Sequence, residues 1–152
     1  RTALPRPARG CRCLATPTPS GRRALDAATK RVVAEAREAY IDAIRPPEDF
    51  GKVYHLRKLQ WRASQPLPAV SLCKVLRAVR AYNDFSPTRV CEWISQSKYA
   101  GVLWTFGREN SPVLYATGDV GVLKALARAA VRAVGADEVN IRADGSLRLW
   151  WD

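Results

Sequence analysis

The chain has 152 residues, 47% of them hydrophobic, and a formal net charge of +11. This length suits one domain that builds its own core without disulfides or metals. No run approaches the ~18 apolar residues that a membrane-spanning helix needs. We therefore expect a protein that is soluble or peripheral to a membrane.

Basic residues are concentrated at the N-terminus. Residues 1–25 contain six arginines and no acid, and the first carboxylate is Asp26. The same segment is rich in proline, serine and threonine, a composition typical of an organelle transit peptide or its remnant. The chain also contains no methionine, which predicts a processed or truncated product. We expect a nucleus-encoded protein that is imported into a mitochondrion or chloroplast.

Residues 1–23 predict an extended basic arm, because their prolines and glycines stop helices and strands from propagating. Such an arm attracts polyanions, namely RNA, anionic lipid headgroups or acidic protein surfaces. The alternative is that its arginines serve import alone. The candidate phosphate contacts in the arm are Arg6, Arg9, Arg12, Arg22 and Arg23.

The segment 24–45 repeats apolar residues every three or four positions, which predicts an amphipathic helix that Pro46-Pro47 ends. Residues 48–66 then form a connector in which basic and aromatic residues alternate, a pattern that can hold phosphates and stack bases. In the alternative, the connector packs its apolar residues on the core and leaves its charges in solvent. The candidate contacts in the connector are Lys52, Arg57, Lys58, Arg62 and Trp61.

Residues 68–97 predict a helical hairpin. The first helix spans 68–82 and ends at Asn83-Asp84, and the second begins at Ser86-Pro87, where serine is an N-cap and proline the first helical residue.

Residues 101–152 predict a β-β-α-β-β unit. Strands at 102–106 and 113–116 form a hairpin, and a helix follows from Asp119 to Gly135. The Asp144-Gly145 turn then joins two final strands. Residues 24–152 thus predict a single α+β domain with three N-terminal helices before this unit.

Trp150-Trp151 lie almost at the C-terminus. Consecutive residues of a strand face opposite sides, so at most one of the two indoles points into the core. The other is a candidate partner contact, or alternatively is covered by the N-terminal arm.

The four cysteines do not predict a metal site. Cys11 and Cys13 are too close for the usual zinc spacing, and the single histidine, His55, is far from every cysteine in the sequence. Cys73 and Cys91 lie in apolar helical patterns, so free thiols are expected, with a disulfide from arm to body as the alternative.

Catalytic motifs are missing. There is no phosphate loop, dinucleotide fingerprint, zinc-protease motif or nucleophile elbow. Asp119 sits where phosphates bind in nucleotide folds, but a carboxylate there caps the helix and repels phosphate. An active site would require Glu92, Glu109, Asp119 or His55 to gather in one cleft. We expect no enzyme, no cofactor and no metal.

These features predict a non-catalytic, lineage-specific accessory subunit of a large organellar assembly. The first expectation is the mitochondrial or chloroplast ribosome, with the basic arm on rRNA. The alternative is a peripheral accessory subunit of an energy-transducing membrane complex, a photosystem or respiratory complex, held by protein contacts.

Overall fold

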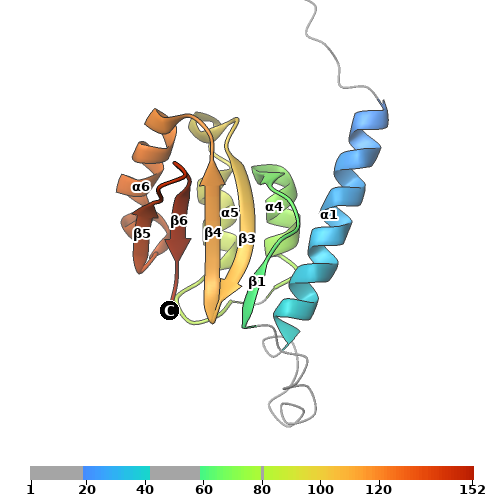
Figure 1. The fold of residues 1–152 in the computed structure, drawn as a ribbon, viewed down its shortest axis with the longest axis horizontal. Coiled ribbons are helices and arrows are strands. Elements are labelled where there is room, and N and C mark those ends of the chain that lie inside the picture. The colour runs from blue at the N-terminus through green and yellow to red at the C-terminus, as the bar shows by residue number, and fades with distance from the viewer. Residues whose placement is uncertain (1–18, 42–58, 80) are drawn as a thin grey trace, which may run out of the picture.

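A computed structural model describes residues 19–41, 59–79 and 81–152, with side chains described from residue 27 on. Within these ranges the chain forms four α-helices and an antiparallel sheet of six strands, which confirms the predicted α+β class. Figure 1 shows α4 and α5 behind the central strands, with α1 and α6 at opposite edges of the molecule. The helices are α1 (Pro19–Ala39), α4 (Ala69–Leu76), α5 (Pro87–Ile94) and α6 (Val120–Val134).

The sheet has the order β1-β3-β4-β6-β5, and β2 also pairs with β3. All pairings are antiparallel. The last strand therefore returns to lie between β4 and β5, which leaves β5 at the edge. The strands are β1 (Gln60–Arg62), β2 (Leu67–Pro68), β3 (Leu103–Glu109), β4 (Ser111–Thr117), β5 (Glu138–Ile141) and β6 (Leu147–Trp150).

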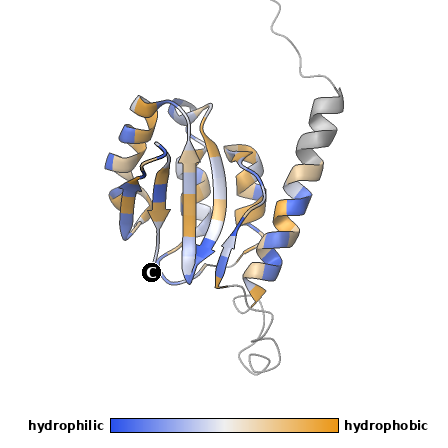
Figure 2. Ribbon diagram, in the orientation of Figure 1, coloured by the Kyte–Doolittle hydropathy of each residue, from blue (hydrophilic) through white to orange (hydrophobic). Residues whose placement is uncertain are grey.

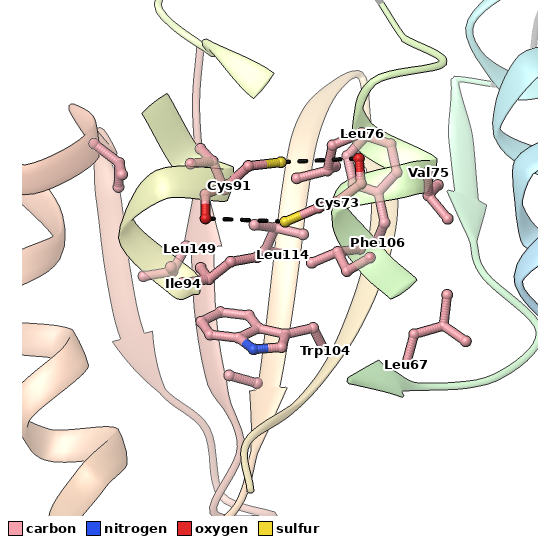
Figure 3. Packing of buried hydrophobic residues seen from close by; sticks show 14 of the residues in the cluster. Leu67, Cys73, Val75, Leu76, Cys91, Ile94, Trp104, Phe106, Leu114 and Leu149 are labelled. Atoms are coloured by element: carbon pink, nitrogen blue, oxygen red, sulfur yellow. Dashed lines mark hydrogen bonds between the residues drawn. The ribbon is translucent and has the colours of Figure 1, made fainter. Parts of the chain in front are cut away.

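The core lies between the helices and one face of the sheet. Alternate residues of the strands point to this face, and Trp104, Phe106, Leu114 and Leu149 are all essentially unexposed. Figure 3 shows them packed against residues of α4 and α5. Figure 2 shows hydrophobic and hydrophilic residues alternating along α1 and α6. This pattern is expected for helices that bury one side.

Both predicted ends of α6 are confirmed. The Asp119 side chain accepts a hydrogen bond from the Val122 N–H at 3.1 Å, and Gly135 ends the helix in a left-handed conformation with φ 67°. A second cap comes from α5, where Arg89 donates to the carbonyl oxygens of Arg132 and Ala133 at 2.9 and 2.7 Å.

Several boundaries differ from the sequence prediction. Helix α1 begins at Pro19 rather than at residue 24, so the last residues of the predicted extended arm are helical. Helix α4 ends at Leu76 rather than at 82, because the chain turns there and Ala78 and Val79 donate to the carbonyl oxygens of Val75 and Leu76. Asn83, further along, takes a left-handed φ of 47°. Helix α5 ends at Ile94 rather than at 97, and the 3₁₀ turn η3 (Ser97–Tyr99) begins where the predicted helix was to end.

The connector and the first hairpin also contain more strand than expected. Part of the predicted connector pairs as β1 on β3, and β2, which directly follows the connector, pairs with β3 as well. Neither strand was predicted. Strands β3 and β4 continue through the predicted loop at 107–112 and reverse at Asn110, whose φ of 60° is one that asparagine tolerates well.

Gly107 makes room for the edge strand β1. A Cβ at this position would lie 2.8 Å from the carbonyl oxygen of Trp61 and 3.0 Å from Cγ1 of Val113. Both distances are shorter than ordinary contacts, so a larger residue would push β1 away from β3.

Arg108 is a fully buried cation that fastens α1 to the sheet. Its Nη1 donates to the carbonyl oxygen of Ala39 at 2.6 Å, and its Nε donates to that of Asn110 at 3.1 Å. The guanidinium also lies 4.9 Å from the centre of the Tyr40 ring. Tyr40 in turn stacks on Phe106 and donates its hydroxyl to the Gly107 carbonyl at 2.7 Å.

Replacing Arg108 by methionine should therefore destabilise the fold. The variant keeps an apolar side chain of similar length but leaves the Ala39 and Asn110 carbonyls without these charged donors, at a cost of about 2–3 kcal/mol. Urea unfolding measures this loss. Lys124→Met, at an exposed position of α6, is the matched control and should change stability by less than about 0.5 kcal/mol. Equal stability of the two variants would contradict the role given to Arg108.

Candidate polyanion-binding surface

Most of the predicted arm and connector contacts lie outside the described side chains. Residues 1–18 and 42–58 are outside the described ranges, which leaves untested the predicted contacts there, Arg6, Arg9, Arg12, Lys52, Arg57 and Lys58, together with His55. Arg22 and Arg23 fall in the first turns of α1 by their backbone, and their side chains are not described.

The tryptophan candidates are divided between the two faces of the sheet. Trp61 is half-buried and packs edge-on against Tyr40 and Phe106, on the core side. Trp151 is fully buried and donates its Nε1–H to the Val134 carbonyl at 3.0 Å, so its side chain belongs to the core. Trp150 lies half-buried on the opposite face. The predicted split of the Trp150-Trp151 pair is confirmed.

The helical layer carries an excess of positive charge. Between residue 27 and the end of α6, every basic residue of the four helices is exposed, and basic residues outnumber acidic ones. The basic residues are Lys30, Arg31, Arg37, Lys74, Arg89, Lys124, Arg128 and Arg132. The acidic residues are Glu35, Glu38 and Glu92.

Three of these cations converge on a groove between α1 and α4. The groove has a volume of about 310 Å³, and its rim carries Lys30, Arg37 and Lys74 above the small apolar side chains of Val33 and Ala34. Thr29 completes the lining, and no described carboxylate contributes to it. The described lining thus contains three basic side chains and no acidic one.

The placement of the groove follows from helix geometry. Lys30, Val33, Ala34 and Arg37 recur at three or four residues and so form one stripe along α1. Lys74 faces this stripe from α4, and neither it nor Arg37 has an ion-pair partner among the described residues. The sequence analysis did not find the groove, because nothing in the sequence shows that α1 packs beside α4.

The open face of the sheet holds a different arrangement, centred on Glu109. Its carboxylate accepts hydrogen bonds from the Tyr115 hydroxyl and from Nε of Arg148, the latter at 2.9 Å. Arg148 also donates to Glu138 at 2.8 Å. Trp150, on β6, reaches across β4 and donates its Nε1–H to the Glu109 carbonyl at 3.1 Å. These bonds join β3, β4, β6 and β5 into one polar layer.

Two further arginines of the open face lie close to the Tyr115 ring. The guanidinium of Arg62 lies 4.0 Å from the centre of the Tyr115 ring, and that of Arg142 lies 5.4 Å from it. The predicted contact Arg62 is thus exposed on the open face, on the other side of the sheet from the basic groove.

The surroundings of Glu109 and Tyr115 shift the pKa values of both side chains. Burial opposes ionisation of Glu109, but hydrogen bonds from Arg148 and Tyr115 and the charge of Arg148 outweigh it, and they lower the pKa of this carboxyl. Burial and the neighbouring carboxylate raise the pKa of the Tyr115 hydroxyl. Glu109 is therefore ionised and paired at neutral pH, which suits a structural role better than proton transfer.

The carboxylates considered for catalysis lie apart. Glu109 is on the open face of the sheet, Glu92 is exposed on α5, and Asp119 caps α6. No group of three or more histidine, cysteine, aspartate or glutamate residues suited to a metal ion occurs among the described residues.

An apolar hollow of about 480 Å³ lies at the start of β3. Val70 from α4 and Leu103 from β3 contribute to its wall and are 70% and 42% exposed. Large apolar side chains with this exposure are suited to a protein contact. None of the described helices combines the length and apolar character that crossing a bilayer requires.

Comparison of the chain with protein-family models, with curated proteins and with solved structures finds no significant match.

Glu109 should contribute a pH-dependent part of the stability. Because its pKa is lowered in the folded state, the contribution is complete above the unfolded pKa of about 4.3 and is lost as pH falls through the folded value. The side chain is 32% exposed, so solvent screens the charge, and Glu109→Gln should cost only about 1 kcal/mol at pH 7.

Urea unfolding at pH 7 and near pH 3 measures this difference, which should shrink at the lower pH. Glu138→Gln is the matched control, since Glu138 binds the same arginine but is 54% exposed, and it should have less effect at both pH values. A loss for Glu109→Gln that is the same at both pH values would show that the carboxylate charge is not responsible.

Proposed function

We propose that the protein is a non-catalytic accessory subunit of a large organellar assembly and that it contacts RNA there. The mitochondrial or chloroplast ribosome is the assembly we put first, with rRNA as the partner. The observation that carries the proposal is the groove between α1 and α4, where Lys30, Arg37 and Lys74 surround an apolar floor.

The groove has the chemistry that a phosphate backbone needs. Lys30 and Arg37 lie seven positions apart on the helix, about 10 Å, which is room for two or three phosphates of one strand. Lys74 adds a third cation from the facing helix. Such contacts neutralise phosphates without reading base sequence, as expected for a subunit that is held in place by structured RNA.

The basic N-terminal arm directly precedes the groove helix α1 in the sequence. Helix α1 carries Lys30 and Arg37 and begins at Pro19, so the basic residues 1–18 lead directly into the helix that forms one wall of the groove. The proposal assigns no catalytic residue, cofactor or metal to the chain.

Neutralising the groove should weaken RNA binding more than neutralising an equal charge elsewhere. The groove variant is Lys30→Gln, Arg37→Gln and Lys74→Gln, and the control is Lys124→Gln, Arg128→Gln and Arg132→Gln on α6, at the opposite edge of the molecule. Fluorescence anisotropy with a mixed-sequence single-stranded RNA should show, for the groove variant, a salt slope reduced by about one unit per side chain.

Both triple variants carry the same net charge, so equal losses of affinity would reject a specific role for the groove. The thermal unfolding midpoint of each variant verifies that it is folded. A chain without residues 1–18 should lose further affinity and salt dependence. If it bound RNA as tightly as the full chain and with the same slope, the arm would have no part in binding.

The apolar hollow supports a second candidate, a peripheral accessory subunit of an energy-transducing membrane complex such as a photosystem or respiratory complex. Its exposed Val70 and Leu103 offer a contact to another subunit without any nucleic acid.

Fractionation of the native source distinguishes the two candidates. The first predicts co-sedimentation with ribosomal particles that is lost after nuclease treatment. The second predicts co-purification with a detergent-extracted membrane complex, weakened by Val70→Asp and Leu103→Asp because each buries a charge in the contact. Recovery with the membrane complex and not with ribosomal particles would reject the ribosomal proposal.

A further inference from the structure

Two cysteines face each other across the interface of α4 and α5 (Figure 3). The Sγ of Cys73 lies 3.9 Å from the carbonyl oxygen of Cys91, and the Sγ of Cys91 lies 3.9 Å from that of Cys73. This reciprocal arrangement brings both sulfurs together on neighbouring helices, although the residues are 18 positions apart in the sequence.

A small molecule has a route to this pair. A surface hollow of about 290 Å³ lies beside it, and Cys91, Ser95 and Arg77 are part of its lining. Each cysteine is only 6% exposed, so a reagent must insert its sulfur–sulfur bond into the hollow to reach the pair. The Ser95 hydroxyl lies 3.6 Å from Sγ of Cys73 and connects the hollow to the second sulfur.

The two thiols differ in acidity. The hydrogen bond with Cys91 is the largest effect on Cys73, and with Ser95 and the charge of Arg77 it outweighs burial and lowers the pKa of Cys73 to about 6. The same hydrogen bond, burial and the nearby Cys73 raise the pKa of Cys91, an effect that Arg77 reduces and Glu92 increases. Cys73 is therefore the more acidic thiol of the pair, and Cys91 is the one that keeps its proton more firmly.

We propose that Cys73 and Cys91 form a redox-active dithiol, a modification site that is oxidised to a disulfide between α4 and α5 by a low-molecular-weight disulfide. The Cys73 thiolate attacks one sulfur of the reagent and releases its other half as a thiolate, which leaves a mixed disulfide. Cys91 then transfers its proton to the released thiolate or to solvent. Its sulfur attacks Sγ of Cys73 and displaces the second half of the reagent.

The balance of the reaction is that of thiol–disulfide exchange. Counted from two protonated thiols, the protein loses two electrons and two protons and gains one S–S bond, while the reagent takes up both and is reduced to two thiols. The new bond closes a loop across the α4–α5 hairpin and should raise the thermal unfolding midpoint by about 5–10 °C. The proposal is independent of RNA binding and can fail or succeed separately from it.

The test uses the full chain with Cys11→Ser and Cys13→Ser, so that the pair supplies the only thiols. Folded protein is incubated with oxidised glutathione, and its remaining thiols are then blocked with a maleimide. We expect a mass lower by two hydrogens, no maleimide adduct, a cross-linked peptide that joins Cys73 and Cys91, and reversal by reduced glutathione in excess. Two maleimide adducts on the folded protein after this treatment would overturn the proposal.

Single variants in the same background assign the order of attack. Cys91→Ser should stop at a mixed disulfide between glutathione and Cys73, because no second thiol resolves it. Cys73→Ser should react at least about tenfold more slowly at neutral pH, since burial still raises the pKa of the remaining Cys91 thiol. Equal rates for the two variants would overturn the assignment of Cys73 as the attacking residue.

A further measurement needs no substitution within the pair. In the reduced parent protein, alkylation located by mass spectrometry should label Cys73 before Cys91, at a rate that rises with pH through about 6. The reverse order of labelling would also overturn the assignment.

Discussion

The attachment of the C-terminal end of α1 to the sheet is the constraint on which the proposed surface depends. Arg108 is buried beneath this end and donates to the carbonyl oxygen of Ala39, one of the groups that the helix leaves without an internal partner. Tyr40 adds a ring stacked on Phe106 and a hydrogen bond to Gly107. Because these contacts fix α1 beside α4, they also fix the distance between the two walls of the basic groove.

The structure was predicted most accurately from the sequence where local signals and tertiary packing favour the same backbone conformation. Asp119 and Gly135 carry the chemistry of a helix start and end, and both act in those roles. The Asp144-Gly145 turn also joins the last two strands as expected, with Gly145 at φ 81°. In each case one residue type satisfies one backbone requirement, so neighbouring residues are enough to identify it.

Prediction failed where the partner of a segment is distant in the sequence. The short strand β1 has no alternation long enough to recognise, and it exists because its backbone pairs with β3. The Arg108 side chain lies within a segment that reads as a polar loop, yet it is buried because the groups that it binds come from α1. The basic groove and the facing cysteines likewise depend on which helices are neighbours.

Helix α4, only eight residues long, carries one residue of the basic groove and one residue of the cysteine pair. Lys74 points to the groove, whereas the preceding Cys73 points to α5. Consecutive helical residues are about 100° apart around the axis, so one short helix serves two different neighbours. A cross-link to α5 would also restrict the helix that positions Lys74.

Gly107 allows the edge strand β1 to pair closely with β3. The missing side chain leaves just enough space for the Trp61 carbonyl oxygen, so the presence of β1 depends on one hydrogen atom in place of a methyl group. A substitution there would push β1 away and uncover the backbone of β3 from Gly107 to Glu109, and such an uncovered edge is a template for pairing with another chain. One glycine in the middle of a strand thus keeps this part of the edge paired.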